Sequence, residues 1–250
     1  MTAEQEFESE LEVFRTESDA AVQFFYSWET IHSVAGDTPS VHKALNKSAL
    51  FWNTTLGALQ TSTIVVLGRI FDPDTTAHSV TRLLALAMKH RSIFDKQHHE
   101  ARHRARNAEA DSYLPSFLDR VYVPNVEDFR NLKRQVAERR KLYENVYQPL
   151  RHKVFAHKSA EPGIDLLWQH TNIRDLQKLL TFLRAMHEAL WQLYFNGRKP
   201  TLRKSRYSVK QMRIKPKGHG AALQERVVLQ TQVVMQTLGQ AYKGGKPRNR

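Results

Sequence analysis

Two side chains near the end of a long helical stretch are suited to phosphate and proton chemistry. Arg151 precedes His157 by six positions in the run LRHKVFAHK, residues 150–158. A guanidinium stays charged and grips a phosphate through a fork of N–H donors, whereas an imidazole gains or loses its proton near neutral pH. The pair is sufficient for RNA cleavage without a metal, in which the histidine takes the 2′-hydroxyl proton and the arginine holds the phosphate.

The spacing of this pair restricts how the two groups can meet. Six residues of α-helix turn about 600°, which leaves the side chains about 120° apart around the axis and about 9 Å apart along it. Either the helix therefore unwinds before His157, or two copies meet across a two-fold axis and share one composite cleft. The second arrangement predicts a homodimer with an Arg151 and a His157 from each subunit.

The same two residues also have a purely structural interpretation. A histidine at the C-terminal end of a helix is favoured by the helix dipole, and an arginine there commonly pairs with an acid. Arg69 and Asp72, at the end of another helical stretch, are spaced for a salt bridge of this structural kind. From the residues alone both interpretations of the Arg–His pair stay open.

The net charge of +13 is concentrated at the end of the chain. Residues 197–250 hold 14 lysines and arginines against one acid, Glu225, whereas residues 1–196 are neutral overall. A basic segment attracts polyanions, of which nucleic acid is the commonest and an anionic membrane the next. The alternative is a solvated extension, or one that pairs with the acidic first helix. We expect RNA as the ligand, and the residues predicted to contact it are His152, Lys153, Lys158, Arg198, Lys199, Arg203, Lys204 and Arg206.

The composition excludes several kinds of site. Cysteine is absent, so disulfides, thiolate zinc sites and a cysteine nucleophile are excluded. The first residues are acidic and lack the apolar core of a secretory signal, and no run of about 18 apolar residues exists to span a membrane. We therefore expect a cytoplasmic protein without a cofactor and without a membrane partner.

Apolar residues recur at intervals of three and four, which predicts helices. Asn172 is placed to cap the last core helix, and Pro149 should kink or restart the one before it. A faint strand pattern occurs at 206–214, and a further amphipathic helix fits 221–242. The fold class is therefore all-α: an antiparallel helical bundle over residues 1–196 and a basic C-terminal extension over 197–250. The core helices are expected at 3–35, 39–71, 76–88, 126–157 and 173–196.

Two segments carry a resemblance to a known family. Residues 59–84, which contain LGRIFD at 67–72, together with LRHKVFAH at 150–157, resemble the abortive-infection (AbiU-type) branch of the HEPN superfamily. The order of elements over about residues 5–196 is also similar. The resemblance implies a helical bundle that dimerises through its Arg–His helices. Members of this branch are often metal-independent endoribonucleases of phage-defence or toxin–antitoxin systems. The resemblance therefore implies this activity, with an antitoxin or a second defence component as partner.

The resemblance carries over Arg151 and His157 as catalytic residues, but the chain departs from the family pattern beside each. His152 stands where asparagine or aspartate is common, and Lys158 and Ser159 stand where an acid often follows the histidine. The second departure bears on how His157 is oriented. A non-catalytic HEPN-like module that binds RNA or a protein is therefore the alternative.

A competing motif is HEARH at residues 99–103, which has the spacing of zinc hydrolases: two imidazoles one helical turn apart with a glutamate between them. Residues 95–111 are nearly all polar, so we expect nothing to bury this helix or to shield a zinc-bound water. We interpret the segment as a solvated basic helix, either resting on phosphates or simply exposed, and expect no metal.

Overall fold

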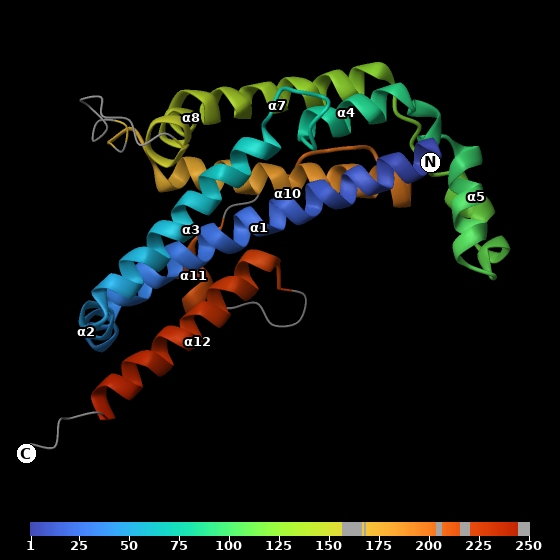
Figure 1. Ribbon diagram of the computed structural model, residues 1–250. Helices are drawn as coiled ribbons and strands as arrows, with labels where there is room; N and C mark the ends of the chain where they lie inside the picture. Colours follow the sequence, from blue (N-terminus) through green and yellow to red (C-terminus); the bar gives the residue numbers. More distant parts are fainter. Residues whose placement is uncertain (157–166, 168, 204–206, 216–220, 245–250) are drawn as a thin grey trace, which may run out of the picture. The chain divides into compact units, whose positions relative to one another are not determined.

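The structure is a computed structural model that describes residues 1–156, 167, 169–203, 207–215 and 221–244 (Figure 1). Every regular element in this part of the chain is a helix, which confirms the predicted all-α class. The elements are α1 (Ala3–Asp37), α2 (Pro39–Lys47), α3 (Ala49–Ile70), α4 (Val80–Lys89), the 3₁₀ turn η1 (Arg91–Phe94), α5 (Lys96–Arg106), the 3₁₀ turn η2 (Ala110–Ser112), α6 (Leu114–Leu118), α7 (Val126–Val146), α8 (Gln148–Leu150), the π-helix η3 (Arg151–Ala156), α10 (Ile173–Asn196), α11 (Val209–Ile214) and α12 (Leu223–Gly244).

Helices α7 and α10 begin where the sequence predicts, and capping residues mark both starts, whereas the helix predicted from residue 76 begins only at Val80, after the cap Ser79. Asn172 begins α10 by accepting a hydrogen bond from the N–H of Arg174 at 2.8 Å, and Gly197 ends it in the left-handed conformation. At the start of α7, Asn125 and Asp128 each accept the other's backbone N–H, a reciprocal cap. These side chains satisfy N–H groups that have no partner inside the helix, which fixes where each helix begins.

Two local predictions are wrong. The helix expected over 39–71 breaks at Ser48, which leaves the helical region at φ −121° and ψ 45°, so α2 and α3 are separate. A serine side chain competes for backbone hydrogen bonds and tolerates such a break. The faint strand pattern at 206–214 contains the helix α11 instead, capped by Ser208. A short alternation of residues does not distinguish a strand from one helical turn or two.

The chain divides into two compact units. Unit 1 comprises Met1–Ser18 and Leu67–Ser205, and unit 2 comprises Asp19–Val66 and Arg206–Arg250. The long helices α1 and α3 each contribute residues to both units. The predicted domain boundary at residue 196 stays a prediction, because compactness does not by itself define an independently folding domain.

The core of unit 1 is built on aromatic rings from four elements. Phe7 of α1 lies 5.2 Å from Phe94 of η1 and 5.1 Å from Tyr194 of α10, between ring centroids, and Phe94 lies 5.7 Å from Phe129 of α7. All four side chains are buried. Each such pair contributes about 0.5–1.5 kcal/mol beyond the burial of its area, so this cluster ties the first turns of α1 to the two long helices.

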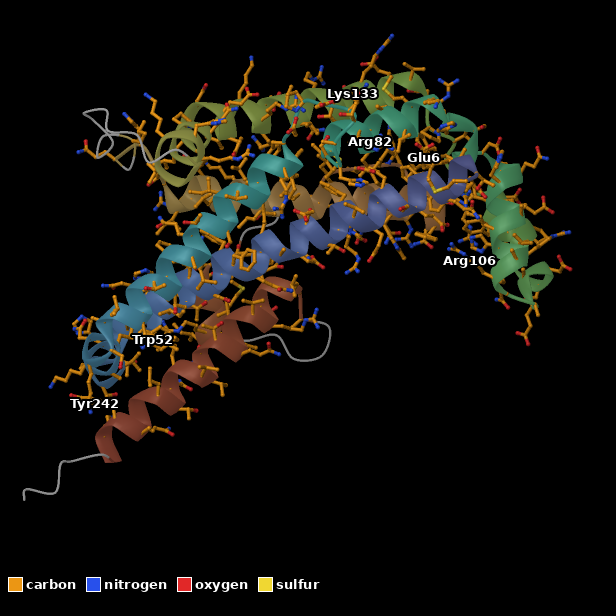
Figure 2. The ribbon with its side chains drawn as sticks, in the orientation of Figure 1. Glu6, Trp52, Arg82, Arg106, Lys133 and Tyr242 are labelled. Atoms are coloured by element: carbon orange, nitrogen blue, oxygen red, sulfur yellow. The ribbon has the colours of Figure 1, made fainter. Side chains whose placement is uncertain are left out.

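The acidic start of α1 is neutralised inside unit 1. Glu6 and Arg82 face one another from α1 and α4 (Figure 2), with 3.4 Å between Oε1 and Nη2. Other ion pairs near this end of the helix join Glu10 to Arg82, Glu4 to Arg102 and Glu8 to Arg106. The basic extension supplies a different contact, in unit 2, where Arg213 lies 2.8 Å from Asp37.

Helix α5 is anchored by a buried arginine, which the sequence analysis did not expect. Arg102 is 7% exposed, and its guanidinium donates to the carbonyl oxygens of Ile93 at 2.7 Å and Tyr194 at 3.0 Å. Its carbon Cζ also lies 4.0 Å from the centre of the Tyr194 ring. The prediction that nothing buries this polar helix is therefore wrong, because hydrogen bonds and an ion pair to Arg102 allow the helix to be buried without an apolar face.

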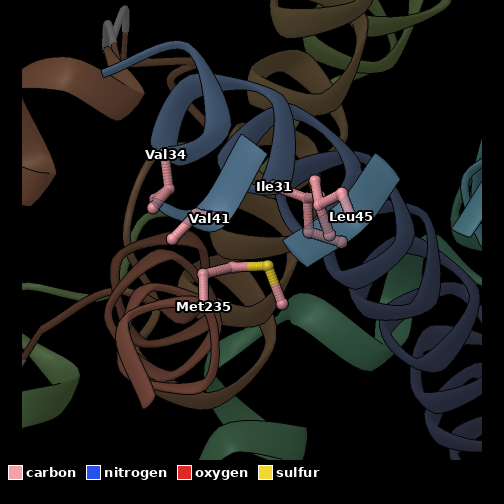
Figure 3. Close-up of a cluster of buried hydrophobic side chains, with 5 residues drawn as sticks. All are labelled: Ile31, Val34, Val41, Leu45 and Met235. Atoms are coloured by element: carbon pink, nitrogen blue, oxygen red, sulfur yellow. The ribbon is translucent and has the colours of Figure 1, made fainter. Parts of the chain in front are cut away.

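Unit 2 has a small apolar core of its own. Ile31, Val34, Val41, Leu45 and Met235 are buried together and come from α1, α2 and α12 (Figure 3). The backbone of Gly239 approaches α2 so closely that a side-chain carbon there would lie 2.8 Å from Val41. The amphipathic helix predicted at 221–242 is thus confirmed as α12, and its apolar face is covered by α2.

Candidate functional site

The chain changes helical type where the Arg–His run begins. Helix α7 ends at Val146, α8 restarts the chain with Pro149 in its first turn, and the π-helix η3 follows. The predicted restart at Pro149 is confirmed. Segments of π-helix are rare and concentrate at functional sites. Arg151 opens η3, while His157 and Lys158, which come directly after it, lie outside the described residues.

The side chain of Arg151 packs against the backbone of Gly68, which has no side chain. A side-chain carbon added to Gly68 would lie 2.9 Å from Nη1 of Arg151, 3.0 Å from its Cδ and 2.5 Å from the hydroxyl oxygen of Tyr143. Any residue other than glycine would therefore displace one of these side chains. The guanidinium also donates a hydrogen bond to the Tyr143 hydroxyl. Arg151 is half-buried, so it is fixed at its root without being sealed from solvent.

Tyr143 is positioned from the other side by an aromatic stack. Its ring lies 5.9 Å from that of Phe71, with 25° between the ring planes. Burial raises the pKa of Tyr143 above its ordinary value, and the neighbouring Arg151 charge offsets part of this effect. The hydroxyl therefore stays neutral at physiological pH and presents a lone pair to the guanidinium.

The end of α3 is clamped to α7 by a second arginine. Arg140 donates from Nε to the carbonyl oxygen of Phe71 at 3.0 Å and from Nη2 to the Thr81 hydroxyl. That hydroxyl donates to the carbonyl oxygen of Asp72 at 3.0 Å. These bonds hold in place the stretch that contains Gly68, and so indirectly position Arg151.

The prediction of a salt bridge between Arg69 and Asp72 is wrong. Arg69 donates from Nε and Nη2 to Glu17 of α1, at 2.9 and 2.6 Å. Asp72 instead accepts the backbone N–H of Asp74 at 2.9 Å and shapes the turn after α3. Short polar side chains commonly bond the backbone two residues on, and Asp72 makes this local bond while Arg69 pairs with Glu17.

The predicted RNA contacts fall into two groups that the fold keeps apart. His152 and Lys153 are exposed on η3, close to the start of α10, since the Tyr147 hydroxyl donates to the carbonyl oxygen of Asn172 at 2.9 Å. Arg198, Lys199 and Arg203 are exposed after the end of that helix. Because α10 has 24 residues, it is about 36 Å long. Lys204 and Arg206 lie outside the described residues.

Three positioning residues escaped the sequence analysis: Gly68, Tyr143 and Arg140. Only Gly68 carried a usable signal. A glycine inside an apolar helix costs about 1 kcal/mol relative to alanine, so its presence calls for a close approach by another group. Tyr143 and Arg140 resemble ordinary core and surface residues of an amphipathic helix until the contacts of α7 with α3 are known.

The zinc motif does not form a metal site in the part of the chain that the structure describes. His99 is fully buried beside Phe117, and burial lowers its pKa to about 4. Both ring nitrogens of His103 are already engaged, Nδ1 with the Tyr113 hydroxyl at 3.0 Å and Nε2 with the Phe195 carbonyl oxygen at 3.2 Å. Among the described residues no group of three or more His, Cys, Asp or Glu is arranged to hold a metal ion.

Fold and site together define an all-helical protein of HEPN type, in which an arginine at a helix restart is fastened to the end of an earlier long helix. The sequence model of the AbiU2 family, a HEPN-like abortive-infection family, matches residues 4–210. The chain belongs to this family. No curated protein and no solved structure matches it. None of the helices in the described ranges has the length and apolar character needed to cross a membrane.

Proposed function

We propose that this protein is a metal-independent endoribonuclease of a phage-defence or toxin–antitoxin system, acting in the cytoplasm. The observation that carries the proposal is the meeting of the two segments on which the family resemblance rests. Gly68 of the first segment has no side chain, and Arg151 of the second occupies the space this leaves. A guanidinium fixed in this way meets a phosphate with little loss of side-chain freedom, which is what charge stabilisation requires.

In the proposed reaction Arg151 binds the scissile phosphate through two N–H donors and stabilises its growing negative charge. The neutral imidazole of His157 accepts the 2′-hydroxyl proton as that oxygen attacks phosphorus. The bond to the 5′-oxygen breaks, and an imidazolium returns a proton to the leaving oxygen. The products are a 2′,3′-cyclic phosphate and a free 5′-hydroxyl, so no metal or cofactor enters the balance.

The proposal includes a homodimer, because it places two Arg151 and two His157 around one phosphodiester. In this arrangement His157 of one subunit acts as the base and the partner subunit supplies the acid. His152, Lys153 and Lys158 add positive potential beside the cleft. An antitoxin or a second defence component would then control the enzyme by covering or separating this interface.

The direct test compares wild type with His157→Ala and Arg151→Ala on total bacterial RNA, in buffer containing EDTA. We expect each variant to lose at least about 100-fold in cleavage rate, because a positioned acid–base group and a positioned charge at the transition state each contribute that much. His170→Ala changes an exposed histidine outside the site and is the matched control. Light scattering should give twice the chain mass of 29.0 kDa for all four proteins.

The alternative is a non-catalytic HEPN-like module that binds RNA or a protein. It is favoured by the excess charge of residues 197–250, which attracts RNA whether or not cleavage follows. Retained cleavage by His157→Ala would overturn the catalytic proposal. Salt-dependent RNA binding without turnover, indifferent to His157, would establish the alternative.

A further inference from the structure

An open pocket lies at the end of α10 that is remote from Arg151. It has a volume of about 430 Å³, which falls in the range of small-molecule binding sites. The lining residues that matter are Tyr113, Phe117, Arg120, Gln192, Asn196 and Arg198. All belong to unit 1. A smaller pocket of about 240 Å³ adjoins it and shares Tyr113 and Asn196.

The left-handed turn at Gly197 builds this pocket. Its φ of 55° turns the chain back, and its carbonyl oxygen accepts a hydrogen bond from the N–H of Tyr122 at 2.7 Å. A side-chain carbon on Gly197 would lie 2.9 Å from Val121. The segment at Val121 and Tyr122 is thus in direct contact with Gly197, and this contact brings Arg198 to the same pocket as Arg120.

The cations of this pocket are not neutralised. Arg120 donates from Nε to the carbonyl oxygen of Ser116 at 2.9 Å, which orients its guanidinium and leaves the two Nη groups available. No Asp or Glu lines the pocket, and within the described residues neither Arg120 nor Arg198 forms an ion pair. By contrast Arg106, in the adjoining pocket, is bonded to Glu8 at 2.7 Å. An uncompensated pair of guanidiniums is suited to an anion, and to a phosphate above all.

The pocket also has a rigid aromatic wall. The ring of Phe117 lies 4.2 Å from that of His103, between centroids. Nε2 of His103 lies 3.2 Å from the carbonyl oxygen of Phe195, and Nδ1 lies 3.0 Å from the hydroxyl oxygen of Tyr113, so the imidazole is held at both nitrogens. Tyr113 and Phe117 are half-buried and thus offer π-faces that are already immobilised.

We propose that this pocket binds one nucleotide of a single-stranded RNA, with the phosphate between Arg120 and Arg198 and the base against Phe117 and Tyr113. It is a second RNA site, separated from Arg151 by the length of α10. The inference rests on the proposed function only in taking RNA as the ligand. Cations next to aromatic rings are the combination that holds single strands without reading their sequence.

The test measures binding with a probe that the protein cannot cleave, so its result is independent of catalysis. The probe is a fluorescein-labelled 2′-O-methyl uridine 12-mer, and the readout is fluorescence anisotropy of the full chain at several salt concentrations. We expect Arg120→Gln/Arg198→Gln to weaken binding about tenfold or more and to reduce the slope of log affinity against log salt by about 0.7, since both arginines hold one phosphate and each phosphate contact contributes about 0.7.

The matched control is Lys133→Gln/Arg134→Gln, which removes the same charge from exposed positions of α7, where Lys133 is labelled in Figure 2. Binding by the control should change less than threefold. If the two double variants lose affinity equally, or if Arg120→Gln/Arg198→Gln binds as tightly as wild type, the pocket does not bind RNA and the proposal is wrong.

The base contact is tested separately. A probe carrying 4-thiouridine should photocrosslink to the tryptic peptide of residues 107–120, which contains Tyr113 and Phe117. Phe117→Leu should weaken binding by about fivefold or more and reduce this crosslink. Circular dichroism checks that Phe117→Leu is folded. If the variant does not fold, the position of the crosslink in the wild-type protein tests the base contact instead. Crosslinks confined to peptides outside 107–120 would contradict the proposed base contact.

Discussion

The two ends of α10 present positive charge in different ways. At its start Arg151 is half-buried, packed over Gly68 and hydrogen-bonded to Tyr143. At its end Arg120 and Arg198 are exposed and line an open pocket without an acid. A fixed guanidinium stabilises charge at one point in space, whereas exposed ones attract a flexible polyanion and hold it loosely. The proposals of catalysis at the first end and of RNA capture at the second rest on this difference.

A fourth arginine, Arg102, shows that residue type alone does not determine what an arginine does. Arg102 is buried, and its donors are used by Ile93, Tyr194 and Glu4. It cannot bind a ligand without losing bonds that hold α5 in unit 1. Hydrogen bonds to a charged group contribute about 1.5–3 kcal/mol each, so this arginine is structural.

The largest effect is expected from Gly68→Val. Its side chain would meet Tyr143 and Arg151 at distances that force both to move, and a misplacement of about 1 Å costs roughly 100-fold in rate. We expect a loss of RNA cleavage of that size, with binding of the 2′-O-methyl probe nearly unchanged. Single-turnover cleavage and anisotropy measure the two effects.

The matched control for this prediction is Gly57→Val. Gly57 lies in the same helix with no neighbouring group within 4 Å of an added carbon, so cleavage should stay near wild type. Equal losses in both variants would mean that a valine harms α3 in general, and that Gly68 does not position Arg151.

The pocket end should also differ in its response to acid. Since burial lowers the pKa of His99 to about 4, the unfolded chain binds a proton between about pH 6.5 and 4 that the folded chain does not. Stability therefore falls as the pH falls through this range, by about 2 kcal/mol at pH 5 relative to pH 7. Urea unfolding of wild type and His99→Leu at both pH values tests this, and the variant should lose that share of the pH dependence.

His170→Leu, at an exposed position, is the control for the acid effect. Hydrogen exchange at pH 5 gives a second measurement, because α5 and α6 should lose protection before α7 does. If His99→Leu and wild type lose equal stability between pH 7 and 5, His99 is not the group responsible.

The smallest effect is expected at the turn that forms the pocket. Gly197→Ala forces an L-residue to a φ of 55° and against Val121, which should lower the free energy of unfolding by about 1–2 kcal/mol. Gly36→Ala, in a helix with open space around it, should instead be neutral or stabilising by up to about 1 kcal/mol. Urea titrations decide the matter, and a neutral Gly197→Ala would show that the turn is not strained.

Much of the fold was predictable because it depends on local signals. Three local signals could be predicted from nearby residues because each acts within about one turn. They are the helical period of the apolar residues, the Asn172 cap and the restart at Pro149. The family resemblance could be recognised for the same reason, because two short runs of residues carry it. The break at Ser48 was missed because its local preference is weak and both flanks favour helix.

The all-α class, most ends of the long helices, the family and the concentration of charge after residue 196 could thus be predicted from the residues alone. That Gly68 meets Arg151, that α5 is held by a buried arginine, and that Arg120 and Arg198 line one pocket is known only from the packed helices. Period and capping are set by neighbours in the chain. Which distant side chains meet depends on how whole helices pack, and no short run of residues encodes that.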